Sequence, residues 1–418
     1  MDFFDFSEKT LELEKKAMKL LEAKFRQTEE IANFNAQKVL SAFIKARVSE
    51  AHLKGSSGYG YDDTGRDAAD EVYKYAFGAE DALVRHNFVS GTHTLSVALF
   101  GVLRPGDRML VVTGTPYDTL HGVIGISGKK GAGSLIDFGV QYDEVALKED
   151  GSVDLENVAK KAPGAKMVYI QRSRGYALRP ALSIDEIEKV VKTVKAIDEN
   201  IIVMVDNCYG EFCETREPTE VGADLIAGSL IKNPGGAIAE TGGYIAGRKD
   251  LVELCANRLT CAGLGKELGC TLGQTKRILQ GFFFSPTVTA AAIKTADLAS
   301  CMFSLAGYEV FPKYDAKRSD IVTSINLKSP EKLIAFCKGI QGSSAVDSYV
   351  SPVPAYMPGY DDDVIMAAGA FNLGSSIELS ADGPMREPYT CFMQGGVTFE
   401  SGRVGILSAY ELVEGINE

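Results

Sequence analysis

The chain has 418 residues, of which 45% are hydrophobic and 24% charged, as in an ordinary globular protein with a large core. A net charge of -12 argues against nucleic acid as the main partner, because phosphate binding needs a basic face. The charged N-terminus lacks a signal peptide's apolar segment, and no run reaches the roughly 18 apolar residues of a membrane span. We therefore expect a cytoplasmic protein with no membrane partner.

Cysteine and histidine usage bears on redox state and metal binding. The eight cysteines are scattered without a CxxC pair, which predicts reduced thiols. The four histidines form no HExxH motif, so we expect no metal centre.

The first predicted element is a helix from about residue 6 to residue 50. Ser7 is a suitable N-cap, and apolar residues recur at helical spacing after it. We assign residues 1–55 to a helical arm that packs across a domain or subunit face.

A glycine-rich loop follows at residues 55–67 and carries Tyr59, Tyr61 and Arg66. Tyrosines on a surface loop are commonplace, so a structural role is one interpretation. Two hydroxyls and a guanidinium are also suited to binding a phosphate dianion.

A helix is predicted at 67–77 and a strand at 82–89, and the strand leads into the motif SGTHT. Its Ser90, Gly91 and Thr92 precede a second helix. Small residues between a strand and a helix allow backbone amides to approach an anion, which is also attracted by the helix dipole. The alternative is an ordinary capped turn.

The next predicted strand, residues 109–113, leads to Tyr117. This side chain could stack on a flat cofactor ring, and His93 is the other candidate for that position. Neither GxxxxGK[ST] nor GxGxxG after a strand occurs, so a nucleoside triphosphate or dinucleotide site is poorly supported.

Three arginines, Arg172, Arg174 and Arg179, follow the strand predicted at 166–171. Cations in a crevice at a strand end are unfavourable unless they meet an anion, whereas a solvated loop would tolerate them. A helix is then predicted over residues 184–197.

The central stretch contains two short apolar runs that read as buried strands of a layered α/β sheet. The first ends at Asp206, and the second, residues 224–231, leads to Lys232 and a Pro/Gly turn. Both residues would stand at carboxyl ends of strands, where open α/β sheets bind ligands. A lysine amine and an anion for a pyridine nitrogen are what pyridoxal phosphate requires. A helix cap and a solvated turn residue are the alternatives.

The C-terminal part alternates short elements. We predict a long helix at 287–305 that links two domains, an irregular active-site wall near residues 351–366, and Arg386 after a strand, where it could bind a carboxylate. The other predicted elements are strands at 321–325 and 376–379 and a helix at 330–338.

With these segments in place, the chain resembles the fold-type I pyridoxal-phosphate enzymes. Within them it is similar to the methionine gamma-lyase-like family, also labelled aluminium resistance protein or cystathionine beta-lyase family protein. The resemblance spans nearly the whole chain from about residue 35 onward. The motifs that carry it are GYGYDDTGRD, SGTHT, TGTPYDTL, IQRSRGY, VDNCYGEF, VGADLIAGSLIKNPGG, TGGYIAGR, MPGY and SIELSADGP.

The resemblance implies a large domain, residues 56–290, with a mainly parallel seven-stranded sheet flanked by helices, and a smaller C-terminal α/β domain, residues 291–418. It also implies that Lys232 holds pyridoxal 5'-phosphate as a Schiff base while Asp206 faces the pyridinium nitrogen. The other residues expected at the cofactor are Ser90, Gly91, Thr92, His93, Tyr117 and Ser229.

Further implications concern the substrate and the oligomer. Tyr61 and Arg66 would reach the phosphate of a neighbouring subunit, which implies a homodimer or homotetramer. The candidates for substrate binding are Tyr59, Arg172, Arg174 and Arg386. One departure is Ile231, which stands where many transsulfuration relatives carry a hydroxyl residue.

The resemblance implies an elimination that cleaves the C–S bond of a sulfur-containing amino acid of the cystathionine or methionine type. Lys232 would act as the base and Asp206 would keep the ring electron-withdrawing, with β- and γ-elimination both open. An aminotransferase or other transferase on the same fold would use the same two residues. A non-catalytic stress or metal-tolerance protein is the other alternative, although the dispersed carboxylates offer no metal site.

Overall fold

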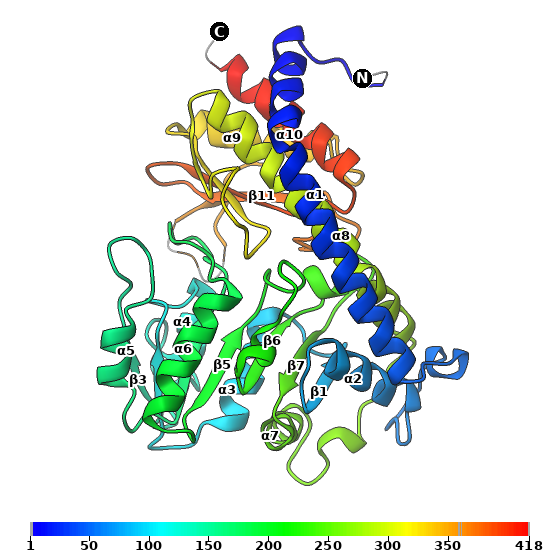
Figure 1. Cartoon of the computed structure of the whole chain (residues 1–418), viewed down its shortest axis with the longest axis vertical. Coiled ribbons are helices and arrows are strands. Elements are labelled where there is room, and N and C mark those ends of the chain that lie inside the picture. Colours follow the sequence, from blue (N-terminus) through cyan, green and yellow to red (C-terminus); the bar gives the residue numbers. More distant parts are fainter. Residues whose placement is uncertain (1–2, 358–359, 361, 417–418) are drawn as a thin grey trace.

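The computed structural model describes residues 3–357, 360 and 362–416. Its larger sheet has seven strands in the order β1-β7-β6-β5-β4-β2-β3 (Figure 1). Neighbours from β3 through β6 pair in parallel, whereas β7 is antiparallel to both β6 and β1, so the predicted mainly parallel seven-stranded sheet is confirmed. The strands are β1 Asp81–Arg85, β2 Arg108–Val111, β3 Gln141–Glu144, β4 Met167–Gln171, β5 Ile202–Asp206, β6 Leu225–Ser229 and β7 Gly243–Gly247.

Each central strand contributes to two cores, one on each face of the sheet. In β4, Val168 and Ile170 pack in one core while Met167 and Tyr169 pack in the other, because successive side chains of a strand point to opposite faces. Burial on both faces explains the continuous apolar runs of the sequence. Helices α2 (Thr64–Ala76), α5 (Leu155–Lys161) and α6 (Ile184–Ile197) cover the first face, and α3 (Gly91–Val102), α4 (Asp118–Ile124) and α7 (Lys249–Leu259) cover the second.

A second, antiparallel sheet has the order β10-β11-β12-β9-β8 and packs against α9 (Pro330–Gly342) and α10 (Phe399–Gly415). The strand predicted at 376–379 is wrong: β11 begins only at Ser380, after Leu379 adopts a φ of 107° that interrupts extended backbone. The strands are β8 Glu309–Phe311, β9 Thr323–Asn326, β10 Val364–Ala367, β11 Ser380–Pro384 and β12 Thr390–Gln394.

Two long helices, α1 (Glu8–Lys45) and α8 (Thr275–Leu305), run side by side along both sheets (Figure 1). Ser7 caps α1 as predicted, its hydroxyl accepting from the Thr10 amide at 3.3 Å. The predicted start of the linking helix at residue 287 is wrong by twelve residues, because α8 continues through Pro286. Pro286 has no backbone N–H to donate to the Phe282 carbonyl. This carbonyl accepts instead from the Ser285 hydroxyl at 2.7 Å.

Helix α8 has the length and composition of a membrane span, but 78% of its most apolar window is buried inside the protein. A buried core helix gives the same signal. The domain boundary predicted at residue 290 falls inside this helix, so the division into domains stays a prediction.

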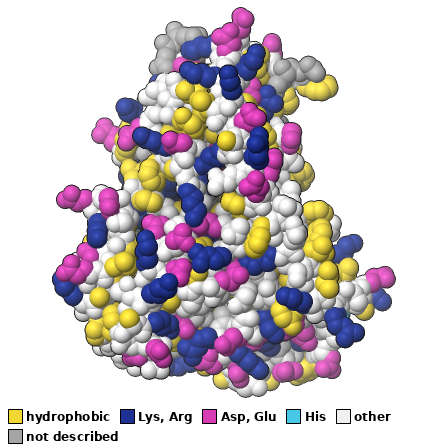
Figure 2. All heavy atoms as spheres, viewed as in Figure 1, with side chains coloured by type: hydrophobic (Ala, Val, Ile, Leu, Met, Phe, Trp, Pro, Cys, Tyr) yellow, Lys and Arg dark blue, Asp and Glu magenta, His cyan; other side chains and the backbone are white. Residues whose placement is uncertain are grey.

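The surface mixes charges of both signs. Figure 2 shows lysine and arginine side chains interspersed with aspartate and glutamate over the face in view. Four short 3-10 helices complete the connections that the structure describes: η1 Glu50–Leu53, η2 Pro218–Val221, η3 Asn233–Gly235 and η4 Gly265–Glu267.

Candidate functional site

Side chains alternate between the two faces of a strand, and this alternation brings three polar side chains of the central strands to one face of the large sheet. Gln171, Asp206 and Ser229 end β4, β5 and β6, and each lies an even number of residues from side chains in the core that contains α3. Gln171 and Asp206 are register partners across the β4–β5 pair. The sheet therefore directs an amide, a carboxylate and a hydroxyl toward the N-terminal end of α3.

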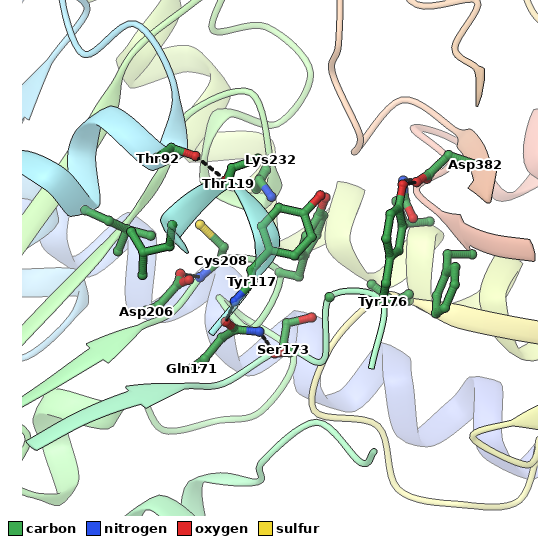
Figure 3. Close-up of a pocket in the computed structure, with 18 residues that line it drawn as sticks. Thr92, Tyr117, Thr119, Gln171, Ser173, Tyr176, Asp206, Cys208, Lys232 and Asp382 are labelled. Carbon is green, nitrogen blue, oxygen red and sulfur yellow. Dashed lines mark hydrogen bonds between the residues drawn. The ribbon is translucent and has the colours of Figure 1, made fainter. Parts of the chain in front are cut away.

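Asp206 and Lys232 line the same cavity, which has a volume of about 200 Å³ (Figure 3). Asp206 is 8% exposed and accepts a hydrogen bond from the Cys208 amide at 3.1 Å. Burial raises the pKa of Asp206, while the Cys208 amide and the charge of Lys232 oppose that rise. Lys232 Nζ lies 3.5 Å from the centre of the Tyr209 ring.

The charge state of Lys232 depends on its neighbours. Burial, the largest influence, lowers the pKa of Lys232, but Tyr209, Cys208 and Asp206 together outweigh it and leave the pKa above its usual value. The protein alone therefore holds this amine as an ammonium.

Hydrogen bonds join the loop after β5 to the turn that carries Lys232. The side-chain nitrogen of Asn233 donates to the carbonyls of Tyr209 and Glu211, each at 3.0 Å. The segment that follows β5 is thus fixed against the segment that carries Lys232, so the carboxylate and the amine keep their relative position.

Tyr117 forms a wall of the cavity, as predicted for an aromatic side chain beside a flat ring. Its amide donates to Gln171 Oε1 at 2.7 Å. Gly175, at φ +59°, approaches the Tyr117 ring so closely that a Cβ at this position would lie 2.6 Å from it. Burial raises the pKa of Tyr117 well above its usual value, so its hydroxyl stays protonated at neutral pH.

The N-terminal end of α3 fits an anion. Ser90 caps this 12-residue helix by accepting from the His93 amide at 3.0 Å, and Gly91 and Thr92 line the cavity. The Ser229 hydroxyl is fully buried, and no hydrogen-bond partner for it exists within the described part of the chain. A Cβ on Gly91 would lie 3.3 Å from Ser229 Cβ, so this hydroxyl sits directly beneath the helix end.

These residues fit pyridoxal phosphate. An orphaned buried hydroxyl and a helix N-terminus are suited to its phosphate, Asp206 to its ring nitrogen and Lys232 to its aldehyde. The structure places Lys232, Asp206, Tyr117, Gly91 and Thr92 around one cavity and Ser229 next to Gly91, and their binding of the cofactor stays a prediction.

Several cavity residues were not predicted from the sequence. Tyr176 donates to the Asp382 carboxylate, which also accepts from Gln394 Nε2 at 3.2 Å (Figure 3). The hydroxyl of Tyr360, a residue of the segment 351–366 predicted as an active-site wall, is hydrogen-bonded to the hydroxyl of Tyr117. Tyr176 and Asp382 lie in the motifs IQRSRGY and SIELSADGP, but only the docking of the small sheet brings them together.

Two of the three arginines predicted to bind substrate, Arg172 and Arg174, lie outside the cavity lining, which corrects the prediction for these two. Arg172 follows Gln171 and therefore faces the opposite side of the sheet, where it is fully buried and donates to Asn207 and Glu214 at 2.7 and 3.2 Å. Arg174 donates to the carbonyls of Phe311 and Val322, each at 2.9 Å. Both guanidinium groups serve protein acceptors and do not line the site.

Four other predicted residues are also outside the cavity lining. Arg66 is buried and donates to the carbonyls of Gly60 and Gly269 at 2.8 and 3.1 Å, whereas Tyr59 and Tyr61 are exposed. Arg386 forms a half-exposed ion pair with Asp362 at 2.9 Å.

His93 likewise turns away from the cavity. Its Nδ1 accepts from the Val89 amide at 3.1 Å, so of the two candidates for ring stacking only Tyr117 is among the residues that line the cavity.

Comparisons with known proteins give matches over nearly the whole chain. The family model described as Methionine gamma-lyase matches residues 10–414. The uncharacterized protein YnbB of Bacillus subtilis is 50% identical over 387 residues, 92% of each chain. A Clostridium novyi structure described as a carbon-sulfur lyase involved in aluminum resistance is 53% identical with a TM-score of 0.93, covering 97% of this chain and 96% of its own.

More distant structures share the fold. A pyridoxal-5'-phosphate-dependent protein of Escherichia coli has a TM-score of 0.59 at 16% identity, covering 94% of this chain and 97% of its own. A methionine gamma lyase from Micromonospora echinospora has a TM-score of 0.56 at 15% identity, covering 82% and 87%. Likeness at this level shows the fold alone, and it confirms the fold-type I prediction.

Proposed function

The chain belongs to the methionine gamma-lyase family, and on that premise we propose that it is a pyridoxal-phosphate-dependent lyase that cleaves the C–S bond of a sulfur-containing amino acid. One observation carries the proposal: the Lys232 amine and the Asp206 carboxylate, from loops and ends of adjacent parallel strands, line one cavity beside Tyr117. The buried Ser229 hydroxyl and the α3 N-terminus support a phosphate at the same place.

Bound pyridoxal phosphate would supply an electron sink for the carbon next to the substrate's amino group. Asp206 would hold a proton on the ring nitrogen, because a buried carboxylate is stabilised by a cation against it. Lys232 Nζ must lose its proton before it acts as nucleophile or base. The protonated ring nitrogen would be a second cation in the cavity, and its charge would favour that loss. Gly91, Thr92 and Ser229 would bind the phosphate.

Tyr117 has two roles in this proposal. Its ring would orient the cofactor, since it is fixed by Gln171 on one side and Gly175 on the other. Its hydroxyl, held protonated by burial, would donate a proton to the departing sulfur.

The first test is an absorbance spectrum of the purified protein. We expect a visible band that disappears in Lys232→Ala and persists in Lys338→Ala, a matched change at an exposed helical lysine. Turnover of Lys232→Ala should fall by about 100-fold or more, as expected for removal of a general base. A band that survives in Lys232→Ala would contradict the assignment.

The second test identifies the reaction. Cystathionine, methionine, cysteine and homocysteine would be screened for release of ammonia and a 2-oxo acid. Equal amounts of both products, together with a thiol, support the lyase. Transfer of the amino group to an added 2-oxo acid would indicate an aminotransferase, and the absence of turnover with every compound would favour a non-catalytic role.

Assembly and location are parts of this proposal. We propose a homodimer or homotetramer in the cytoplasm, in which the exposed loop with Tyr59 and Tyr61 meets a neighbouring subunit. Sedimentation equilibrium of the full chain tests the assembly, and a monomer at micromolar concentration would contradict it.

A further inference from the structure

The ring of Tyr209 lines the cavity next to the amine of Lys232. Lys232 Nζ lies 3.5 Å from the centre of this ring, whereas the other lysine–ring contacts of the described chain measure between 5.0 and 6.0 Å. The face of an aromatic ring attracts a cation, and the attraction grows where water is excluded. The contact at Lys232 should therefore be stronger than the others.

Tyr209 adopts a backbone conformation that a tyrosine rarely takes. Its φ is +69°, in the left-handed region that glycine enters at least cost. Its carbonyl accepts from the side-chain nitrogen of Asn233 at 3.0 Å and from the Cys213 thiol at 3.3 Å, which fixes this conformation. Strained conformations of bulky residues cluster at functional sites. Glycine would fit this backbone with less strain but would remove the ring.

Two features hold the ring against the amine. Asn233 directly follows Lys232, so its hydrogen bond to the Tyr209 carbonyl joins the residue that supplies the ring to the neighbour of the residue that supplies the amine. Tyr209 also packs against an apolar cluster that includes Ile293 of α8 and Ile377. The ring is thus supported from behind and has little freedom to leave the amine.

Three other groups face the Lys232 amine. Asp206 and Cys208 line the same cavity, and Asp382 from β11 lies on its far side (Figure 3). Burial has the largest influence on the pKa of Lys232 and lowers it, and Tyr209 is the strongest of the influences that raise it, ahead of Cys208 and Asp206. With Asp206 assigned to the ring nitrogen of the cofactor, Tyr209 remains to stabilise the ammonium form.

We infer that Tyr209 is a positioning residue whose ring face holds the protonated Lys232 amine at the cavity wall whenever this amine is not bonded to the cofactor. As a role in catalysis, this inference rests on the proposed lyase function. In that reaction a proton moves from the carbon next to the substrate's amino group to Lys232 Nζ, and the electron pair of the C–H bond stays on the carbon. The ammonium formed in this step would rest on Tyr209 until its proton is passed on.

Two rings of similar shape and opposite charge distribution test the contact. Tyr209→Phe keeps the negative face of the ring, whereas the fluorines of pentafluorophenylalanine in place of Tyr209 remove it. The full-length chain, freed of cofactor with hydroxylamine, would be labelled with acetic anhydride between about pH 6 and pH 9. Mass spectrometry would follow Lys232. We expect its acetylation to be about 10-fold faster in the fluorinated chain at each pH, because only the free amine reacts, and Tyr209→Phe to resemble the wild type.

The cofactor-loaded enzyme gives a second measurement. Lys232 must be unprotonated to act as a base, so the acid side of the kcat–pH profile should lie about one pH unit lower in the fluorinated chain than in Tyr209→Phe. Pentafluorophenylalanine in place of Tyr75, an exposed ring with Lys74 Nζ at 5.1 Å, is the matched control and should change neither measurement. If the chain fluorinated at position 209 does not fold, Tyr209→Leu takes its place with the same expected differences.

The outcomes separate this inference from the proposed function. Equal or slower acetylation of Lys232 in the fluorinated chain overturns the contact, whether or not a sulfur amino acid is cleaved. Faster acetylation with an unchanged kcat–pH profile supports the contact and contradicts its role in the reaction. Faster acetylation in a protein that cleaves none of the candidate substrates supports the contact and contradicts the lyase.

Discussion

Replacing Glu211 with glutamine should change how the stability of the protein depends on pH. Glu211 lies in the loop after β5 and is fully buried; its Oε1 accepts from the Tyr244 hydroxyl at 2.8 Å. In the part of the chain that the structure describes, Oε2 has no hydrogen-bond partner. Burial, opposed by hydrogen bonds and by Arg172, raises the pKa of Glu211 from 4.5 to about 8.

The sign of this pH dependence of stability follows from proton binding. Between about pH 4.5 and 8 the folded protein binds this proton and the unfolded chain does not, so the contribution of Glu211 to stability falls as pH rises through this window. A rise of this size corresponds to at most about 5 kcal/mol, at about 1.4 kcal/mol per pKa unit. Glutamine keeps the acceptor for Tyr244 and carries no titrating proton.

Urea unfolding of wild type and Glu211→Gln at pH 5 and pH 9 checks this. The two proteins should have similar free energies of unfolding at pH 5, and the variant should be more stable by up to about 5 kcal/mol at pH 9. The exposed Glu199→Gln is the matched control. A difference between wild type and Glu211→Gln that is the same at both pH values would refute the reasoning.

Two further predictions concern the supports of the site. Arg172→Met should lower the free energy of unfolding by about 3–5 kcal/mol, because it removes the cation paired with the buried Glu217 and one of the two cations paired with Glu214, whereas Arg216→Met at a half-exposed pair should cost at most about 1 kcal/mol. Denaturant titration measures both, and equal effects would contradict the argument. Gly235→Ala should prevent the Lys232 turn from forming, because its Cβ would lie 1.6 Å from a backbone carbonyl, while Gly122→Ala meets nothing within 4 Å. Circular dichroism and cofactor absorbance compare the two variants, and a native spectrum for Gly235→Ala would count against the turn.

Local patterns in the amino-acid sequence are enough to predict the large sheet and the central Asp206–Lys232 pair of the site. Short apolar runs closed by polar residues predict buried strands whose carboxyl ends meet at one edge, and this pattern predicts Asp206 and Lys232 at that edge. The same reasoning identified the α3 N-terminus, because Ser90 and Gly91 are local signals. The resemblance extended these predictions to Ser229 and Tyr117.

The three-dimensional fold sets which side of the sheet each charged residue faces and which residues the small sheet adds to the cavity. Arg172 follows Gln171 by one residue and so points into the opposite core, a difference that composition does not reveal because a strand alternates its faces. Glu211 stands in a stretch that also contains Glu214 and Glu217, and it is buried against Tyr244. Asp382 meets Tyr176 across 206 residues of sequence, and such long-range contacts depend on how α8 positions the two sheets, which no local pattern encodes.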